Sequence, residues 1–262
     1  MHPELTQVYQ SLRAKRDICL TERVCGIDIF GLLTCGLWFF PQYFSNSAYN
    51  LGSNSQDLYS SYQLYNFFSS RLPNLKNIFL GVSVFSLGYE LAKTSRNFIC
   101  DSFHALYRID YPNYEYDMKN FKTCRKLRGF SFPSSCNGFL FPGAIPHDIT
   151  TLEERITGHL RENKRLPSQL VYITAMARLA HRSKQELHLV LMPARSDYVN
   201  ALPVRAELFE PVDKLLEGRA SNPIIDFYSK SVFEDEDFYD FDHLNLNGAK
   251  KFSKQLKEFF HD

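Results

Sequence analysis

Short apolar runs alternate along the chain with longer stretches in which apolar residues recur at helical spacing. The predicted strands are residues 24–30, 48–51, 77–82, 187–192 and 224–228. The predicted helices are residues 4–22, 56–72, a segment beginning at Thr151, and residues 167–183, 207–216 and 248–260. Strands that alternate with helices in this way predict an α/β fold with a mostly parallel sheet covered on both faces.

The carboxyl ends of such strands are where a binding site is expected. In open α/β sheets the ligand crevice lies outside the carboxyl ends of the strands. The turns that follow residues 30, 51, 82 and 192 are therefore the predicted positions of functional side chains.

Helix-start signals support four of the predicted helices. Thr151 and Glu154 have the spacing of a capping box, in which the two side chains reciprocally accept backbone N–H groups. Pro3 and Pro167 suit first-turn positions, where a missing N–H costs nothing. Asn247 is the predicted N-cap of a helix that starts at residue 248.

Residues 103–149 break the alternation. This stretch is rich in Tyr, Phe, Pro and Gly and has no clear period. A loop of this length in a compact domain is usually a functional lid or a local subdomain. The alternative is an insertion that packs for stability only.

Composition narrows the class of protein. The chain has 262 residues, 44% of them hydrophobic, which predicts a single globular domain over residues 1–262 with the insertion at 103–149. The formal net charge is +1 and no basic stripe is visible, so no nucleic-acid partner is expected. Most of the 23 Phe and 15 Tyr are expected to pack in the core, and a surplus of rings in loops could line a binding surface.

The cysteines and the apolar runs bear on the cellular compartment. Six cysteines are scattered without a C-x-x-C pair or a zinc-ligand spacing, so buried, reduced thiols are expected. The N-terminus does not resemble a signal peptide. The longest apolar run, residues 26–40, is short for a membrane span and contains Asp28. These features predict a cytoplasmic protein with no transmembrane segment.

The most informative stretch for chemistry runs from residue 238 to residue 249. Asp240 stands three residues before His243, directly before the last predicted helix. This spacing lets a carboxylate hold one imidazole nitrogen as N–H, while the other nitrogen takes a proton, as in a Ser-His-Asp triad. The neighbouring acidic residues lack the regular ligand spacing of a calcium loop, so no metal site is predicted.

Here the sequence resembles the GDSL/SGNH hydrolase superfamily. D-x-x-H followed by L-N and G-A near the C-terminus is similar to its closing signature. Residues 50–59 resemble the second block of bacterial members linked to cell-surface polysaccharides, and residues 79–86 resemble their third block. The segment Val190–Pro193 with Asp197 and Tyr198 also has counterparts there. The resemblance spans residues 23–260 and leaves the insertion uncovered.

The resemblance implies a flavodoxin-like three-layer α/β/α sandwich with a mostly parallel five-stranded sheet. It implies ester hydrolysis, or acyl transfer to a sugar hydroxyl, with the nucleophile just after the first strand. The turn at Gly52 would lend a backbone N–H to an oxyanion hole. No bound cofactor is expected, although the family suggests acetyl-coenzyme A as a donor for transfer.

One departure from the family affects the nucleophile. The first block should read roughly Gly-x-Ser, but this chain reads Phe-Gly-Leu-Leu-Thr-Cys-Gly over residues 30–36. Thr34 is a hydroxyl nucleophile whose β-branching crowds attack, and Cys35 would suit if His243 lowered its pKa. Ser53 and Ser55 on the neighbouring turn are further candidates. Ser83 stands where the third block usually has Asn, so one oxyanion donor is altered.

The sequence thus predicts a carbohydrate O-acyltransferase or esterase in cell-surface polysaccharide (capsule) biosynthesis. The alternative is the same fold with a degenerate site, acting as a carbohydrate-binding or scaffold module. A third reading is an unrelated flavodoxin-like protein with a receiver or flavin role, although no nucleotide-binding glycine motif is present.

Overall fold

The computed structural model describes residues 3–20, 29–32, 39–126, 150–164, 167–217, 224–230 and 232–261. Its helices and strands, in chain order, are α1 (Pro3–Cys19), β1 (Ile29–Leu32), β2 (Ala48–Asn50), α2 (Leu58–Ser69), β3 (Asn77–Val82), α3 (Cys100–Tyr107), α4 (Met118–Lys126), α5 (Leu152–Lys164), α6 (Leu170–Ser183), β4 (Glu186–Leu191), α7 (Ser196–Asn200), α8 (Arg205–Leu216), β5 (Ile225–Asp226) and α9 (Leu246–His261). Short 3-10 turns lie at Pro41–Tyr43, Leu91–Lys93, Asn97–Ile99 and Asp235–Asp237.

The strands form one parallel sheet in the order β2-β1-β3-β4-β5. The chain moves outward from β1 to β2, then crosses back to pair β3 on the other side of β1. This reversal is the topological switch point, where open α/β sheets form their ligand crevice. The predicted α/β class with a parallel sheet is confirmed.

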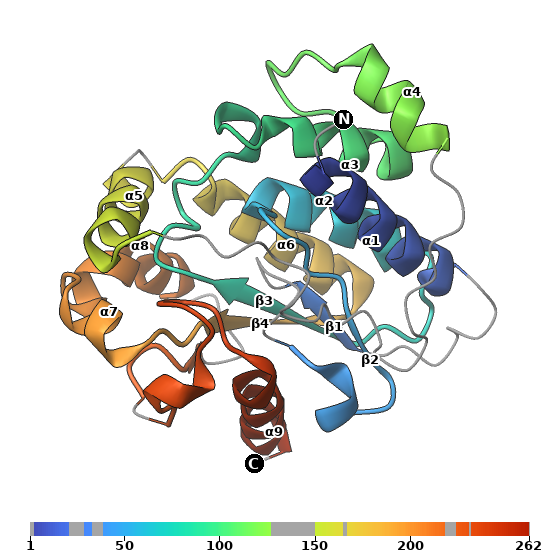
Figure 1. Cartoon of the computed structure of the whole chain (residues 1–262). Coiled ribbons are helices and arrows are strands. Elements are labelled where there is room, and N and C mark those ends of the chain that lie inside the picture. Colours follow the sequence, from blue (N-terminus) through green and yellow to red (C-terminus); the bar gives the residue numbers. More distant parts are fainter. Residues whose placement is uncertain are drawn as a thin grey trace.

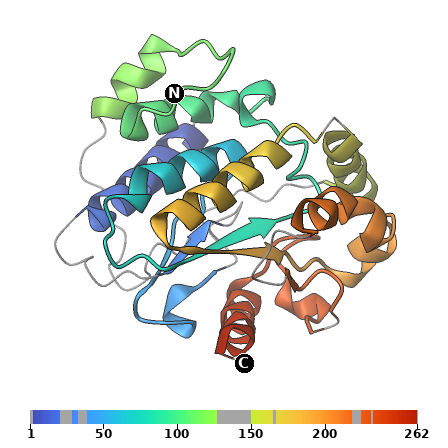
Figure 2. The same ribbon diagram turned by 180° about the vertical axis from the view of Figure 1, so that it is seen from behind.

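Helices cover both faces of the sheet. Figures 1 and 2 show α1, α2, α3 and α6 on one face and α9 on the other. Along β3 the side chains of Ile78, Leu80 and Val82 join the core beneath the larger helical layer, whereas Phe79 joins the core beneath α9. This alternation follows from the two-residue period of a strand, and it explains why β3 reads as a continuous apolar run.

The third group of helices lies at the carboxyl edge of the sheet. Figure 1 shows α5, α7 and α8 beyond the arrowhead of β3, and Figure 2 shows the same arrangement from behind. These helices therefore border the expected crevice. Among the described residues, no helix is both long and apolar enough to span a bilayer.

The interpretation of residues 103–149 as irregular structure is wrong for part of the stretch. Residues up to 107 belong to α3, and α4 occupies Met118–Lys126. Tyr111 is buried, lies against Tyr59 of α2, and shares a hydrogen bond of 2.6 Å with Ser60. These tyrosines stabilise the helical layer, which explains their lack of an apolar period. Phe130, Phe132, Phe139 and Phe141 lie outside the described residues.

Three of the six cysteines can be placed. Cys19, Cys100 and Cys124 are buried and free. Burial raises the pKa of the Cys124 thiol to about 11 and raises the pKa values of the other two as well. These three are thus the buried, reduced thiols that the sequence predicts. Cys25, Cys35 and Cys136 lie outside the described residues.

Phe79 offers a test of the layered core. Its fully buried ring contacts Phe44, Phe260 and His188, so Phe79→Ala should leave a cavity beneath α9. We expect a loss of about 3–5 kcal/mol in the free energy of unfolding, measured by urea denaturation. The control is Val171→Ala on α6, where the side chain is 59% exposed and a change within about 0.5 kcal/mol is expected. Equal losses in both variants would contradict this packing.

Candidate active site

The loop of residues 238–245 lies at the carboxyl edge of the sheet. The backbone N–H of Arg195, four residues beyond β4, donates to the carbonyl of Phe241 at 2.9 Å. The Arg195 guanidinium also lies 4.5 Å from the centroid of the Phe241 ring. These two contacts therefore hold the loop beside the end of β4, at the edge of the sheet where a ligand is expected to bind.

Within this loop the carboxylate of Asp240 and the imidazole of His243 are in direct contact. His243 Nδ1 lies 2.8 Å from Asp240 Oδ2 and 3.0 Å from Asp240 Oδ1. Asp240 Oδ1 also accepts the backbone N–H groups of Asp242 at 3.0 Å and His243 at 2.8 Å. The carboxylate thus requires a proton on Nδ1, which leaves Nε2 as the basic nitrogen of the ring.

The loop itself is a tight reversal. Phe238 and Leu244 form an antiparallel bridge, and the N–H of Tyr239 donates to the carbonyl of His243 at 2.7 Å. Asp240 lies at the tip of this reversal, so its side chain folds back over the backbone of the next three residues. The D-x-x-H spacing acts through this geometry.

The helix that follows the loop begins earlier than predicted. α9 starts at Leu246, and its cap is Asn245, not Asn247. Asn245 Oδ1 accepts the N–H groups of Asn247 at 2.9 Å and Gly248 at 3.0 Å. A glycine is required at position 248 by close packing, because a Cβ there would lie 2.1 Å from the carbonyl oxygen of Asp237. The L-N-x-N-G-A sequence therefore packs the start of α9 closely against the turn before the loop.

A buried ion pair joins the loop to α5. Arg155 Nε donates to Asp242 Oδ1 at 2.8 Å, with the side chains 16% and 8% exposed. Arg155 NH2 lies 3.4 Å from His243 Nδ1. The guanidinium thus stands beside the Asp240–His243 pair while neutralising the second carboxylate of the loop.

The electrostatics of the two carboxylates follow from these contacts. Burial acts to raise the pKa of Asp240. The hydrogen bond and the electrostatic influence of His243 have the larger, opposite effect, so the pKa lies below the ordinary value of an aspartate. For Asp242 burial again opposes ionisation, but the electrostatic influence of His243 and the charge and hydrogen bond of Arg155 outweigh it, so its pKa also falls below the ordinary value. Both groups are carboxylates at neutral pH.

The same residues could be considered as metal ligands. Asp240, Asp242 and His243 each offer a ligand atom within 4.8 Å of the others. However, His243 Nδ1 is already bonded to Asp240, and Arg155 supplies the positive charge at Asp242. A divalent cation would have to compete with a fixed guanidinium, so the arrangement suits proton transfer better than metal binding.

The second-block turn carries three of the predicted site residues. The N–H of Gly52 donates to Asn50 Oδ1 at 2.8 Å, so an oxyanion role would require this bond to open. The Ser53 hydroxyl is buried and has no hydrogen-bond partner among the described residues. Ser55 has a positive φ of 57°, and its hydroxyl accepts from Arg96 at 3.1 Å. The Ser55 hydroxyl is thus engaged by Arg96, whereas the Ser53 hydroxyl is enclosed without a partner among the described residues.

The third-block residue Ser83 follows β3 at the same edge. It is buried, and its backbone N–H donates to the Ser86 hydroxyl at 2.9 Å. Thr34 and Cys35 lie outside the described residues. Their neighbours are placed, however: β1 ends at Leu32, and the carbonyl of Phe39 accepts from Asn50 Nδ2 at 2.7 Å. The described residues on either side of this segment, Leu32 and Phe39, thus lie next to the carboxyl ends of β1 and β2.

Sequence reasoning missed two residues of α5 and gave Tyr198 only a general role near the fourth strand. His159 Nδ1 lies 2.5 Å from the Tyr198 hydroxyl, and its ring lies 4.6 Å from that of Phe85, just after Ser83. Arg155 and His159 are one helical turn apart, so they share a face of α5. The i, i+4 spacing of Arg155 and His159 was the available signal in the sequence. Without the fold, however, nothing connected Arg155 to His243, which lies 88 positions away in the sequence.

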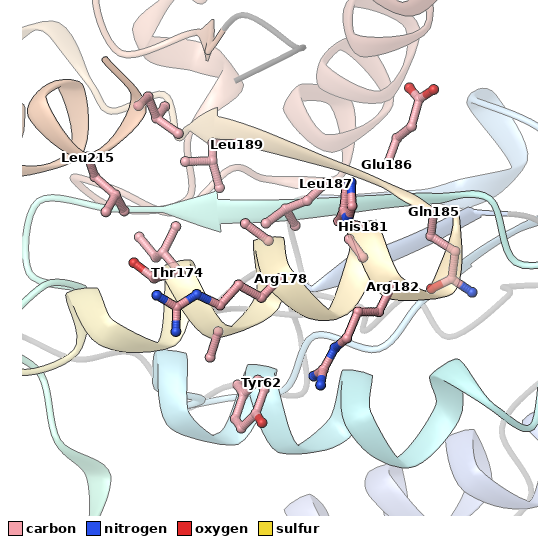
Figure 3. Close-up of a pocket in the computed structure, with 15 residues that line it drawn as sticks. Tyr62, Thr174, Arg178, His181, Arg182, Gln185, Glu186, Leu187, Leu189 and Leu215 are labelled. Atoms are coloured by element: carbon pink, nitrogen blue, oxygen red, sulfur yellow. The ribbon is translucent and has the colours of Figure 1, made fainter. Parts of the chain in front are cut away.

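A pocket of about 860 Å³ lies elsewhere, along α6. Figure 3 shows Arg178 and Arg182 on α6 and Tyr62 on α2 among its lining residues. The pocket also reaches residues 185–187 at the amino end of β4, opposite the edge that carries His243. None of the predicted site residues that the structure describes lines this pocket.

Comparison with known proteins gives limited guidance. No protein-family model matches the sequence, and no curated protein is significantly similar to it. One solved structure with a related arrangement is the crystal structure of a protein from Bacteroides fragilis described as a "putative acylhydrolase". The match covers 89% of this chain and 85% of that one, with 10% identity and a TM-score of 0.45. A likeness at this level leaves the chemistry to be argued from the site itself.

The ion pair between Arg155 and Asp242 should be important for stability. Arg155→Met leaves a buried carboxylate without its partner, and we expect a loss of about 3–5 kcal/mol in unfolding free energy. Lys214→Met is the matched control, because Lys214 and Glu210 form a pair that is 65% and 58% exposed. The control should change stability by less than about 1 kcal/mol. Comparable effects of the two substitutions would contradict a special role for the buried pair.

Asp242 should also shape the acid limb of the stability profile. Its pKa is lowered in the folded state, so its ionisation stabilises the protein fully above its ordinary value of 3.8. That contribution is lost as the pH falls below 3.8 toward the folded-state value. Urea denaturation between pH 6 and pH 3 should therefore show a shallower decline for Asp242→Asn than for the wild type. Parallel profiles would show that this carboxylate does not carry the effect.

Proposed function

We propose that this protein is an SGNH-type esterase or O-acyltransferase that acts on an ester or a sugar hydroxyl. The proposal depends on one observation, the bidentate contact of Asp240 with His243 Nδ1 at the carboxyl edge of a parallel sheet. The strand order 2-1-3-4-5 is also the flavodoxin-like order that the sequence resemblance implies.

The chemistry follows from the protonation state of His243. Its Nδ1–H is held by Asp240, so Nε2 removes the proton from an attacking hydroxyl or thiol. The nucleophile adds to the ester carbonyl carbon, and the negative charge collects on the carbonyl oxygen. Collapse of this intermediate breaks the bond to the leaving group, which takes the proton from His243. Water or a sugar hydroxyl then attacks the acyl-enzyme by the same route.

Four residues are candidates for the nucleophile. Thr34 and Cys35 follow β1 in the sequence, at the point where the family has its serine. Ser53 has a buried hydroxyl without a partner among the described residues, whereas Ser55 is bonded to Arg96. The proposal therefore ranks Cys35, Thr34 and Ser53 ahead of Ser55.

The setting of the reaction is part of the same proposal. The resemblance to polysaccharide-associated bacterial proteins points to a carbohydrate acceptor in capsule or related cell-surface synthesis. Transfer in the cytoplasm would use a thioester donor such as acetyl-coenzyme A. Both statements depend on the sequence blocks around residues 50–59 and 79–86.

A carbohydrate-binding or scaffold module is the second candidate function. Two observations favour it: the first block has no serine, and the Gly52 N–H is already bonded to Asn50. In that case the Asp240–His243 pair would bind a sugar hydroxyl without a reaction.

Hydrolysis of p-nitrophenyl acetate tests the proposed chemistry. His243→Ala should lower kcat/KM by roughly 10²- to 10⁴-fold because the general base is lost. Asp240→Asn should lower it because the ring loses the acceptor that fixes its tautomer. His181→Ala on the exposed face of α6 is the control and should leave the rate unchanged.

The nucleophile is identified in the same assay. Among Thr34→Ala, Cys35→Ala, Ser53→Ala and Ser55→Ala, the variant that loses as much activity as His243→Ala marks the attacking group. A parallel assay measures free coenzyme A released from acetyl-coenzyme A in the presence of sugars. Absence of both activities in the wild type would reject the enzyme and favour the binding module.

A further inference from the structure

A second histidine stands beside the Asp240–His243 pair. His159 is one helical turn from Arg155 on α5, and its ring packs on Phe85, two residues after Ser83. Arg155 in turn lies 3.4 Å from His243 Nδ1. His159 therefore lies between the third-block loop and the candidate base.

The hydrogen bond from Tyr198 fixes the tautomer of His159. The Tyr198 hydroxyl is 2.5 Å from His159 Nδ1, and within the described parts of the chain it has no other hydrogen-bond partner. Tyr198 is 1% exposed, and if Nδ1 carried the proton and donated to the phenol oxygen, the buried O–H of Tyr198 would be left without an acceptor. Nδ1 is consequently the acceptor, and the proton of the neutral ring is on Nε2.

The ring stays neutral at physiological pH. Burial lowers the pKa of His159 to about 4, and the positive charges of Arg155 and His243 act in the same direction against the carboxylates of Asp242 and Asp240. Burial likewise raises the pKa of Tyr198, so the phenol keeps its proton. A neutral imidazole with a fixed N–H is a hydrogen-bond donor that cannot act as a base through that nitrogen.

We propose that His159 is a further catalytic residue, whose Nε2–H donates to the carbonyl oxygen of the acyl group and replaces the amide missing from the third block. The proposal rests on the esterase or acyltransferase function proposed above. Within the described parts of the chain no hydrogen bond to Nε2 is formed and the ring is only partly buried, so no other acceptor competes with a ligand for this N–H. Its place beside Phe85 is the region from which the family's asparagine would donate, where this chain has Ser83.

The two histidines thus carry opposite tautomers for opposite tasks. In His243 the Asp240 carboxylate places the proton on Nδ1, and Nε2 accepts a proton during the reaction. In His159 the Tyr198 hydroxyl occupies Nδ1, and Nε2–H stabilises the charge that develops on the carbonyl oxygen. One residue type then supplies both the donor, His159, and the proton acceptor, His243. The two histidines differ in the group that is bonded to Nδ1.

The kinetic test compares His159→Leu with His159→Gln. Leu keeps the apolar contact with Phe85 but has no donor, and kcat for p-nitrophenyl acetate should fall about 10²-fold with little change in KM. Gln keeps a side-chain N–H and should recover part of that loss. Tyr198→Phe removes the hydroxyl that sets the tautomer of His159 but leaves the imidazole in place. Its loss in kcat should therefore be smaller than that of His159→Leu. Wild-type kcat in His159→Leu would overturn the proposal and leave the esterase function intact.

A spectroscopic test separates this inference from the proposed function. Long-range ¹H–¹⁵N spectra of the wild type should show the Nε2–H tautomer for His159 and the Nδ1–H tautomer for His243. Sodium acetate, a probe with the carboxyl oxygens of an acyl product, should shift the His159 ring signals. In His159→Gln, which lacks those signals, acetate should leave the His243 ring signals unshifted. An Nδ1–H tautomer for His159, or no acetate shift, would overturn the donor role even in an active enzyme. The expected spectra with an inactive wild type would reject the esterase function but support the donor.

Discussion

The buried ion pair between Arg155 and Asp242 connects three parts of the chain that the sheet alone would leave separate. It fastens α5 to the loop that carries Asp240 and His243, and the same helix presents His159 to Tyr198 and Phe85. A buried carboxylate without a partner is strongly unfavourable, so the loop and α5 are stable only together. The geometry of the candidate site therefore depends on a contact outside the residues that would do the chemistry.

The sheet explains why these groups meet at this edge. All pairings are parallel, so the turn that follows each strand lies at the same edge of the sheet, and the reversal between β1 and β3 places the topological switch point there. Along that edge His159 of α5 contacts Phe85 after β3 and Tyr198 of α7, and one helical turn away on α5 Arg155 contacts Asp242. The Asp240–His243 loop closes the series through the bond from Arg195 to Phe241.

Sequence patterns predicted the elements whose physics is local. Residues 77–82 form β3 as expected, and Thr151 and Glu154 form the expected capping box, with bonds of 2.8 and 3.2 Å. The D-x-x-H contact was also predictable, because three residues span it. The helices within residues 100–126 were not predictable, since Tyr111 between them is held by a hydrogen bond and a ring contact from the distant helix α2. The roles of Arg155 and His159 were not predicted for the same reason, because their partners Asp242 and Tyr198 are distant in the sequence.

The comparison of the two histidines shows how far residue type alone can mislead. Both are partly buried imidazoles within the same cluster of charges, and sequence reasoning assigned chemistry only to the one with an aspartate three residues away. A carboxylate can only accept a hydrogen bond at Nδ1, whereas a phenol with no other acceptor must donate there. The neighbour at Nδ1 thus decides whether the opposite nitrogen is an acid or a base, and a single missing asparagine need not mean a missing donor.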